Sequence, residues 1–189
     1  MVTTGSPDAT GTNWKLPWVS AAFFALPDLS YRVAYLFFED WVAEVDVETH
    51  LLLSSGFITD KWPMLRQLGF TRLDAALPVT GGLVMVFSGD SCGVISRDPN
   101  VKHAVGPMKT WEWWPGLKEM GFAAVSAALW TEGNVMFFSG SEYGILEFQG
   151  HLVFGPRSVQ DFKSLASILW IHHPVVPVYP PGSTRTCSI

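Results

Sequence analysis

Short apolar runs separated by glycine-containing turns follow one another along most of the chain. The segment from Val125 to Phe148 reads VSAALWTEGNVMFFSGSEYGILEF, in which two apolar runs and an alternating stretch are divided by Glu-Gly and Ser-Gly turns. Apolar runs of about four to eight residues between such turns are typical of β-strands. The first run, from Ser126 to Trp130, alternates poorly, so we expect a strand that is buried on both faces.

The same order of runs occurs again in two other parts of the chain. The stretch that begins at Ser126 has counterparts that begin at Asp74 and Ser20, and VMFFSG from Val135 matches VMVFSG from Val84. Repeats of about 50 residues that each contain several strands are typical of β-propellers.

Each repeat ends with a loop and a short segment that looks helical. KWPMLRQLGF begins at Lys61, WWPGLKEMGF begins at Trp113, and DFKSLAS from Asp161 is a degenerate form. Trp62 and Trp114 hold the same place in this pattern, so we expect both in the core. Each repeat is therefore predicted to contain three strands, a loop and a short helix.

These repeats predict one all-β domain over residues 1–189, folded as a four-bladed propeller. The chain ends break off within a fourth unit, because ASILW at 166–170 matches SAALW and NWKLPW at 13–18 resembles a helix end. Closure of the last blade by both ends would hide edge strands. The expected blades are 19–72, 73–124, 125–165, and 166–189 together with 1–18.

The repeat resembles the hemopexin repeat, the unit of a family of four-bladed propellers. The likeness rests on the starts at Ser20, Asp74 and Ser126, the turns after Phe87 and Phe138, and the segments GPMKTWEWWPGL (106–117) and GPRSVQDF (155–162). It implies that the first strand of each blade lines a central channel, and that an ion can sit on the axis. The chain departs from the family in two places. The usual Tyr-Trp is Ser91-Cys92 in one repeat and Tyr143-Gly144 in the next, and no cysteine lies in the first repeat.

Composition narrows the function. Hydrophobic residues make up 48% and charged residues 15% of the chain, and 9 Trp and 13 Phe suggest aromatic surface around a cavity or contact patch. The net charge of −5 and the lack of a basic cluster argue against nucleic acid. We find no membrane-spanning run and no secretory signal, so we expect no membrane contact and a cytoplasmic protein, as a monomer or homodimer.

No common catalytic motif occurs in the sequence, and the five histidines are scattered. We favour an ordinary loop for His172-His173 over a metal or heme site. No cofactor is expected to be required, apart from the axial ion that the resemblance allows. Glu39, Asp40, Glu44 and Asp46 are expected on a solvent face.

The candidate site follows from the first strands. Asp74 starts a buried strand and either caps backbone N–H groups or serves as a general acid or base. Trp130, Trp170 and Phe24 are candidates for the wall of an apolar pocket at one channel mouth. The predicted catalytic residues are Asp74 and His172, and the predicted substrate-binding residues are Phe24, Ser20, Ser126, Trp130, Trp170 and Tyr179.

Three functions compete. The main hypothesis comes from a resemblance in class to intracellular fungal hetero-Diels–Alderases, which join a tropolone quinone methide to a terpene. Such a pericyclase needs little more than an aromatic pocket that holds small hydrophobic substrates. The alternative is a non-catalytic protein that binds heme or a polyamine, like seed albumins with this repeat. A protein-interaction domain is the third possibility.

Overall fold

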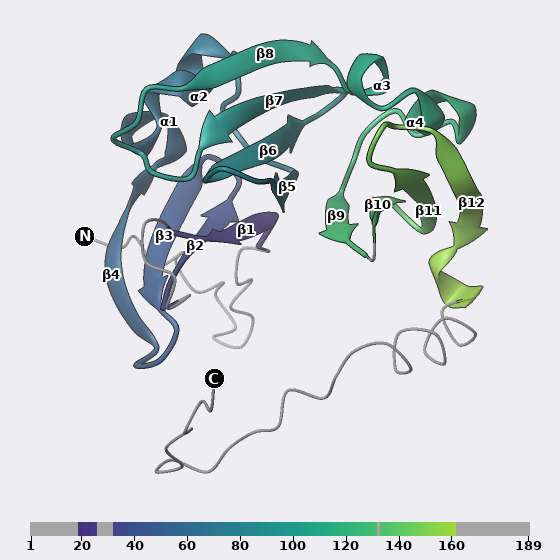
Figure 1. Ribbon diagram of the computed structural model, residues 1–189. Coiled ribbons are helices and arrows are strands. Elements are labelled where there is room, and N and C mark those ends of the chain that lie inside the picture. Colours follow the sequence, from purple (N-terminus) through teal and green to yellow (C-terminus); the bar gives the residue numbers. More distant parts are fainter. Residues whose placement is uncertain (1–18, 26–31, 132, 162–189) are drawn as a thin grey trace, which may run out of the picture.

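The computed structural model describes residues 19–25, 32–131 and 133–161, which form three four-stranded antiparallel sheets (Figure 1). Each sheet is one blade, with its strands in chain order from the inside outward. Blade 1 contains β1 (Ala21–Phe24), β2 (Val33–Phe38), β3 (Trp41–Asp46) and β4 (Leu51–Phe57). Blade 2 contains β5 (Ala75–Pro78), β6 (Leu83–Ser88), β7 (Ser91–Ser96) and β8 (Ala104–Lys109). Blade 3 contains β9 (Ala127–Trp130), β10 (Asn134–Ser139), β11 (Glu142–Glu147) and β12 (Leu152–Ser158).

The all-β prediction is confirmed, and one feature of the repeat is corrected. Each blade has a fourth strand where the sequence predicted a loop. These outer strands are mostly exposed, and their apolar and polar residues do not alternate as in a half-buried strand. Two of them also contain a Gly-Pro pair, which reads as a loop signal in a sequence. The expected fourth blade, 166–189 with 1–18, lies outside the described residues.

Short helices follow the outer strands. They are α1 (Ile58–Lys61), α2 (Pro63–Gln67), α3 (Thr110–Trp113), α4 (Pro115–Glu119) and the 3₁₀ turn η1 (Val159–Asp161). Pro63 and Pro115 start their helices, where the missing N–H costs nothing. Trp62 and Trp114 lie between the paired helices and are buried, as predicted. No helix in the described part of the chain is long and apolar enough to cross a membrane.

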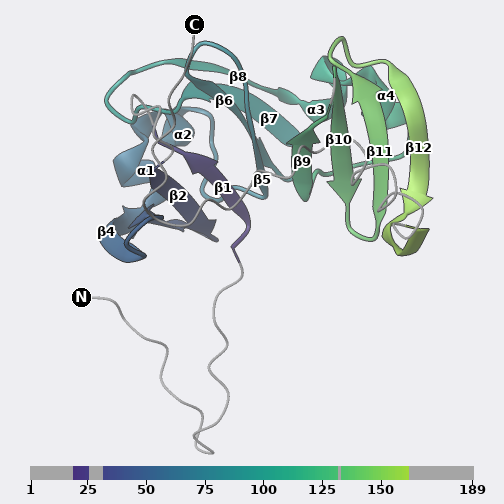
Figure 2. The same cartoon turned by 60° about the horizontal axis from the view of Figure 1, so that its bottom comes forward.

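The first strands lie side by side on the inside of the molecule, with β1 against β5 and β5 against β9 (Figures 1 and 2). The prediction that they are buried on both faces is tested on β5, which has a described blade on either side and whose residues are all buried or half-buried. Residues of β1 alternate between buried and exposed, and the blade expected on the exposed side lies outside the described residues. The strands with continuous buried runs are β6 and β7, which have a blade on either side.

Two apolar cores join the blades. The first places Phe23, Phe37 and Trp62 of blade 1 against Val84, Val86 and Ile95 of blade 2. The second places Leu77, Met85, Phe87 and Trp114 of blade 2 against Val135, Phe137 and Leu146 of blade 3. Each such side chain contributes about 1.5–3 kcal/mol when it is fully buried.

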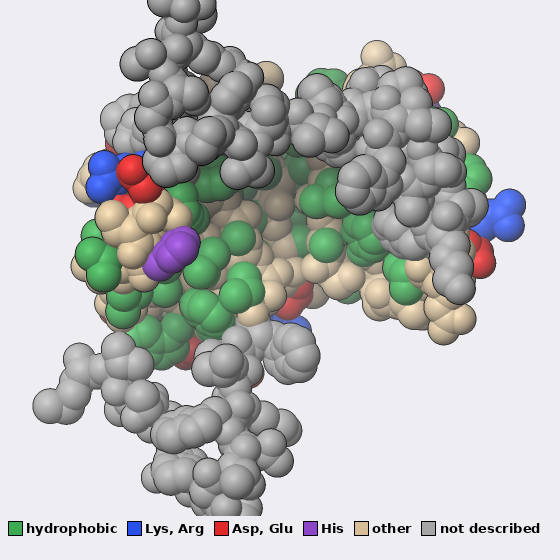
Figure 3. All heavy atoms as spheres, turned by 90° about the horizontal axis from the view of Figure 1, so that it is seen from below, with side chains coloured by type: hydrophobic (Ala, Val, Ile, Leu, Met, Phe, Trp, Pro, Cys, Tyr) green, Lys and Arg blue, Asp and Glu red, His purple; other side chains and the backbone are tan. Residues whose placement is uncertain are grey.

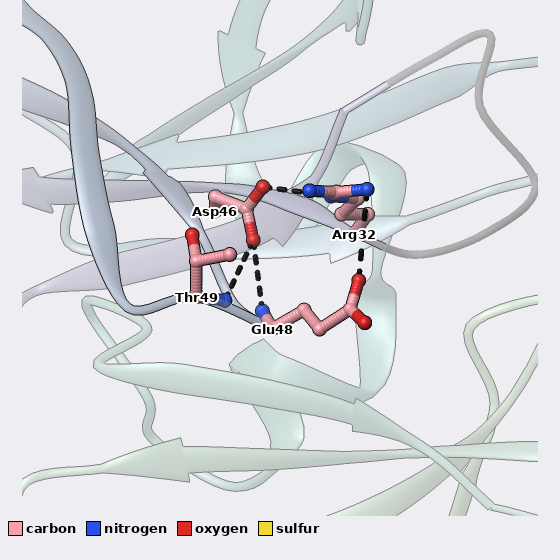
Figure 4. Close-up of polar contacts among 4 residues, drawn as sticks. All are labelled: Arg32, Asp46, Glu48 and Thr49. Carbon is pink, nitrogen blue, oxygen red and sulfur yellow. Dashed lines mark hydrogen bonds and ion pairs between the residues drawn. The ribbon is translucent and has the colours of Figure 1, made fainter. Parts of the chain in front are cut away.

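Asp46 holds the turn between β3 and β4 (Figure 4). It is buried, so the prediction that it lies on a solvent face is wrong. Its carboxylate accepts the backbone N–H groups of Glu48 and Thr49 at 3.0 and 2.9 Å, and Arg32 donates to it at 2.7 Å. The Thr49 N–H and the Arg32 guanidinium lower the pKa of Asp46 to about 2. Ser96 holds the corresponding turn of blade 2 by accepting the N–H of Asp98.

Because the folded state lowers this pKa, the stabilisation from Asp46 is present above about pH 4 and is lost as the pH falls toward 2. We expect Asp46→Asn to lower the melting temperature at pH 7 and to flatten its fall between about pH 4 and pH 2. Thermal unfolding followed by circular dichroism measures both effects. Glu48→Gln is the matched control, since the exposed Glu48 lies 3.6 Å from the same arginine. Equal acid profiles for Asp46→Asn and the wild type would contradict this role.

Candidate functional site

The predicted site residues on the first strands separate into two groups. We call Ser20, Asp74 and Ser126, which precede β1, β5 and β9, the polar end. We call Phe24, Pro78 and Trp130, which finish the same strands, the aromatic end. Four residues of extended chain span about 13 Å, so the two groups lie at opposite ends of the inner strands. The structure therefore does not bring all the predicted residues to one site.

The aromatic end presents two large exposed rings, because Phe24 is 40% and Trp130 is 41% exposed. The indole N–H of Trp130 donates to the carbonyl oxygen of Pro78, which ties the ends of β5 and β9 together. Phe148 packs on the other side, with its ring centre 5.6 Å from that of Trp130. The sequence analysis missed Phe148, although its place at the end of the alternating stretch was a signal. These contacts fix the indole plane and leave part of it open to solvent.

The residues of the polar end form hydrogen bonds that hold the backbone of their own blades. The backbone N–H of Ser20, Asp74 and Ser126 each donates to the second strand of its own blade, at 2.8 Å in every case. The Ser20 hydroxyl donates to the Phe37 carbonyl at 3.2 Å. The Asp74 carboxylate accepts the N–H of Gly89 at 2.6 Å, and Arg72 lies 3.3 Å from its other oxygen. Asp74 therefore caps the turn between β6 and β7, and its role as a general acid or base stays a prediction.

The remaining predicted residues, His172, Trp170 and Tyr179, lie outside the described residues. The described histidines are His50, His103 and His151, and all three are exposed in the connections before the outer strands. Across 19–25, 32–131 and 133–161, no three histidine, cysteine or acidic side chains gather as a metal site would need. The axial ion stays a prediction.

Three groups whose pKa values are raised lie on the second and third strands. Burial raises the pKa of Tyr35 to about 12 and that of the Cys92 thiol to about 11. Cys92 is therefore protonated at neutral pH and is a poor nucleophile. Burial also raises the pKa of Tyr143. These groups are part of the blade interiors, where a substrate has no access, and their shifts reflect packing.

Comparison with known proteins identifies the fold. No family model and no curated protein sequence matches the chain. A 2S albumin seed protein from Dolichos is similar in structure, with a TM-score of 0.66, 24% identity, and coverage of 78% of this chain and 73% of that one. The hemopexin-fold protein CP4 from cow pea has a TM-score of 0.65 and 22% identity, and the match covers 77% of this chain and 70% of that one. A plant lectin with two metal-binding sites from Cicer arietinum has a TM-score of 0.65 and 22% identity, and the match covers 76% of this chain and 69% of that one. The described blades thus have the hemopexin fold.

The polar end yields a stability prediction. Asp74→Ala leaves the N–H of Gly89 without its acceptor, so we expect the free energy of unfolding to fall by about 1–2 kcal/mol. Asp74→Asn keeps an acceptor oxygen, so its free energy of unfolding is expected to fall by less than that of Asp74→Ala. Urea denaturation measures both variants. Ser126→Ala, at the equivalent exposed position of blade 3, is the control and is expected to stay within about 0.5 kcal/mol of the wild type. A loss in Ser126→Ala as large as in Asp74→Ala would argue against capping.

Proposed function

We propose that this protein is a non-catalytic binding module that takes a small organic ligand at the aromatic end. The observation that carries the proposal is the exposed indole of Trp130, held in place by Pro78 and Phe148. A fixed aromatic ring with an open face is a suitable surface for an apolar or cationic group, because little conformational entropy is lost on binding.

The geometry favours binding over catalysis. Both oxygens of Asp74 already have protein partners, so this carboxylate is engaged in holding a turn. Proteins with the same fold also support a binding role. One is described as a lectin with two metal-binding sites, and another as a plant albumin showing hemagglutination. These descriptions name recognition of a ligand or a surface, and none names a chemical step.

Within the binding hypothesis, charge favours a cationic ligand with an apolar chain, such as a polyamine. The chain carries a net charge of −5, which attracts cations over long range. An ammonium group over an exposed aromatic ring gains about 0.5–1 kcal/mol for each contact. Heme is the other ligand of the hypothesis, and the candidate ligands for it, His172 and His173, lie outside the described residues.

The hetero-Diels–Alderase hypothesis stays a prediction. It would use the same aromatic end to hold two apolar substrates, with donors nearby to polarise the heterodiene. At the aromatic end the Trp130 indole is a donor, but its N–H is already bonded to Pro78. Binding alone therefore accounts for the described contacts more simply.

The test is a binding titration with spermine and, separately, with hemin, followed by calorimetry and tryptophan fluorescence. We expect spermine to bind with an affinity that falls as salt rises, and Trp130→Ala to weaken it about two- to fivefold. Trp41→Ala is the matched control, because Trp41 is exposed to a similar degree, 38%, but lies on β3. Spermine binding that is unaffected by Trp130→Ala would overturn the proposed site. Acceleration of a quinone methide cycloaddition would favour the pericyclase instead.

A further inference from the structure

The outer strand of blade 1 is an unusually apolar sheet edge. Leu51, Leu52 and Leu53 are 60%, 52% and 51% exposed, and Phe57 at the other end of β4 is exposed as well. Among the described strands β4 pairs only with β3, so its outer backbone groups face outward. Hydrophobic side chains gather on the blade 1 side of the molecule in Figure 3. A strand edge of this kind is a template for pairing with another strand.

The equivalent edges of the other two blades are protected. The β4 sequence LLLSSGF corresponds to HAVGPMK at 103–109 and to LVFGPRS at 152–158. Both counterparts carry a proline, which cannot donate a ladder hydrogen bond, and a basic residue close behind it. The Arg157 guanidinium lies 5.6 Å from the ring centre of Phe154, which places a positive charge beside the apolar part of β12. In β4 the Gly-Pro pair is replaced by Ser54-Ser55, and the basic position is taken by Gly56 or Phe57.

The charges beside β4 neutralise one another within the blade. Lys61 is ion-paired with Glu44, and both groups hydrogen-bond to Ser54, at 3.0 and 2.7 Å respectively. From Leu51 to Phe57 the strand itself carries no charged side chain. A two-fold axis sets each strand against an identical one, so a charge near the centre would face its own copy. β4 carries no such charge, whereas the same pairing of β8 or β12 would set Lys109 opposite His103 or Arg157 opposite Val153.

We propose that β4 is the interface of a homodimer, in which the β4 strands of two copies pair antiparallel and continue blade 1 across a two-fold axis. An axis at Ser54 sets Leu51 opposite Phe57 of the second copy, which joins apolar side chains at both ends. The second copy is the occupant that fits best, because the edge is uncharged, self-complementary and unlike its two counterparts in the same chain. A contact of one strand and its flanking side chains is small, so we expect a dissociation constant on the order of micromolar.

The test is the oligomeric state of the full chain, measured by sedimentation equilibrium between about 1 and 100 μM, a range around the expected constant. We expect the wild type to dimerise, and Leu53→Lys to weaken the dimer at least about tenfold because two lysines then approach across the axis. The double variant Ser54→Gly/Ser55→Pro copies the Gly-Pro pair of the other two blades and is also expected to weaken the dimer. Val105→Lys, at the equivalent position of β8, is the matched control and should leave the dimer intact.

Hydrogen exchange gives a second measurement that does not depend on a variant that might misfold. The amides on the outer side of β4 should become protected as concentration rises, while those of β8 should not change. A chain that is monomeric at every concentration overturns the proposal. Protection of β4 in such a monomer would show that another segment of the same chain covers the edge. A dimer broken by Val105→Lys and not by Leu53→Lys would place the interface on blade 2 and also overturn it.

Discussion

Face-to-face burial of apolar side chains between consecutive blades is the constraint on which this structure depends. No sheet here buries both of its faces by itself, so each blade needs a neighbour on either side. Blade 2 has both neighbours among the described residues, and its middle strands are buried except at their ends. Trp62 and Trp114 complete the two contacts from the helix pairs. The repeated helix pattern thus serves to fill the space between blades.

This packing fixes the inner strands and thereby divides the functional surface. Because a polar residue precedes each of β1, β5 and β9 and an apolar residue ends it, stacking the repeats collects each kind of residue at one end. At the polar end the Asp74 side chain holds a turn through its bond to Gly89, and the Ser20 hydroxyl bonds the neighbouring strand. At the aromatic end Trp130 is held by its N–H, so part of its ring stays open. The division explains why a binding role fits the geometry better than acid–base chemistry.

The outer strands are not packed between blades, so nothing in the packing of the blades requires them to be apolar. Blades 2 and 3 carry proline and basic residues there, which is the usual way to guard an edge. Blade 1 has Ser54-Ser55 and no basic residue in these places, and three exposed leucines precede them. An apolar edge that the blade packing does not explain is therefore best understood through a contact with another molecule, and its lack of charge suits an identical partner.

The sequence by itself determined the repeat, the all-β class, the inner strands and the buried tryptophans, because these depend on local patterns that recur three times in the chain. Only the tertiary structure decided which faces are covered. Leu77 and Leu129 occupy equivalent positions, yet Leu77 is fully buried where blade 3 packs on it, and Leu129 is 52% exposed because no described blade follows blade 3. Asp46 was expected in solvent because alternation cannot reveal that a turn folds its own N–H groups onto the carboxylate. The fourth strands were missed because exposed edges carry no periodic signal. Burial of these positions is set by neighbours distant in the chain, and a local pattern does not contain that information.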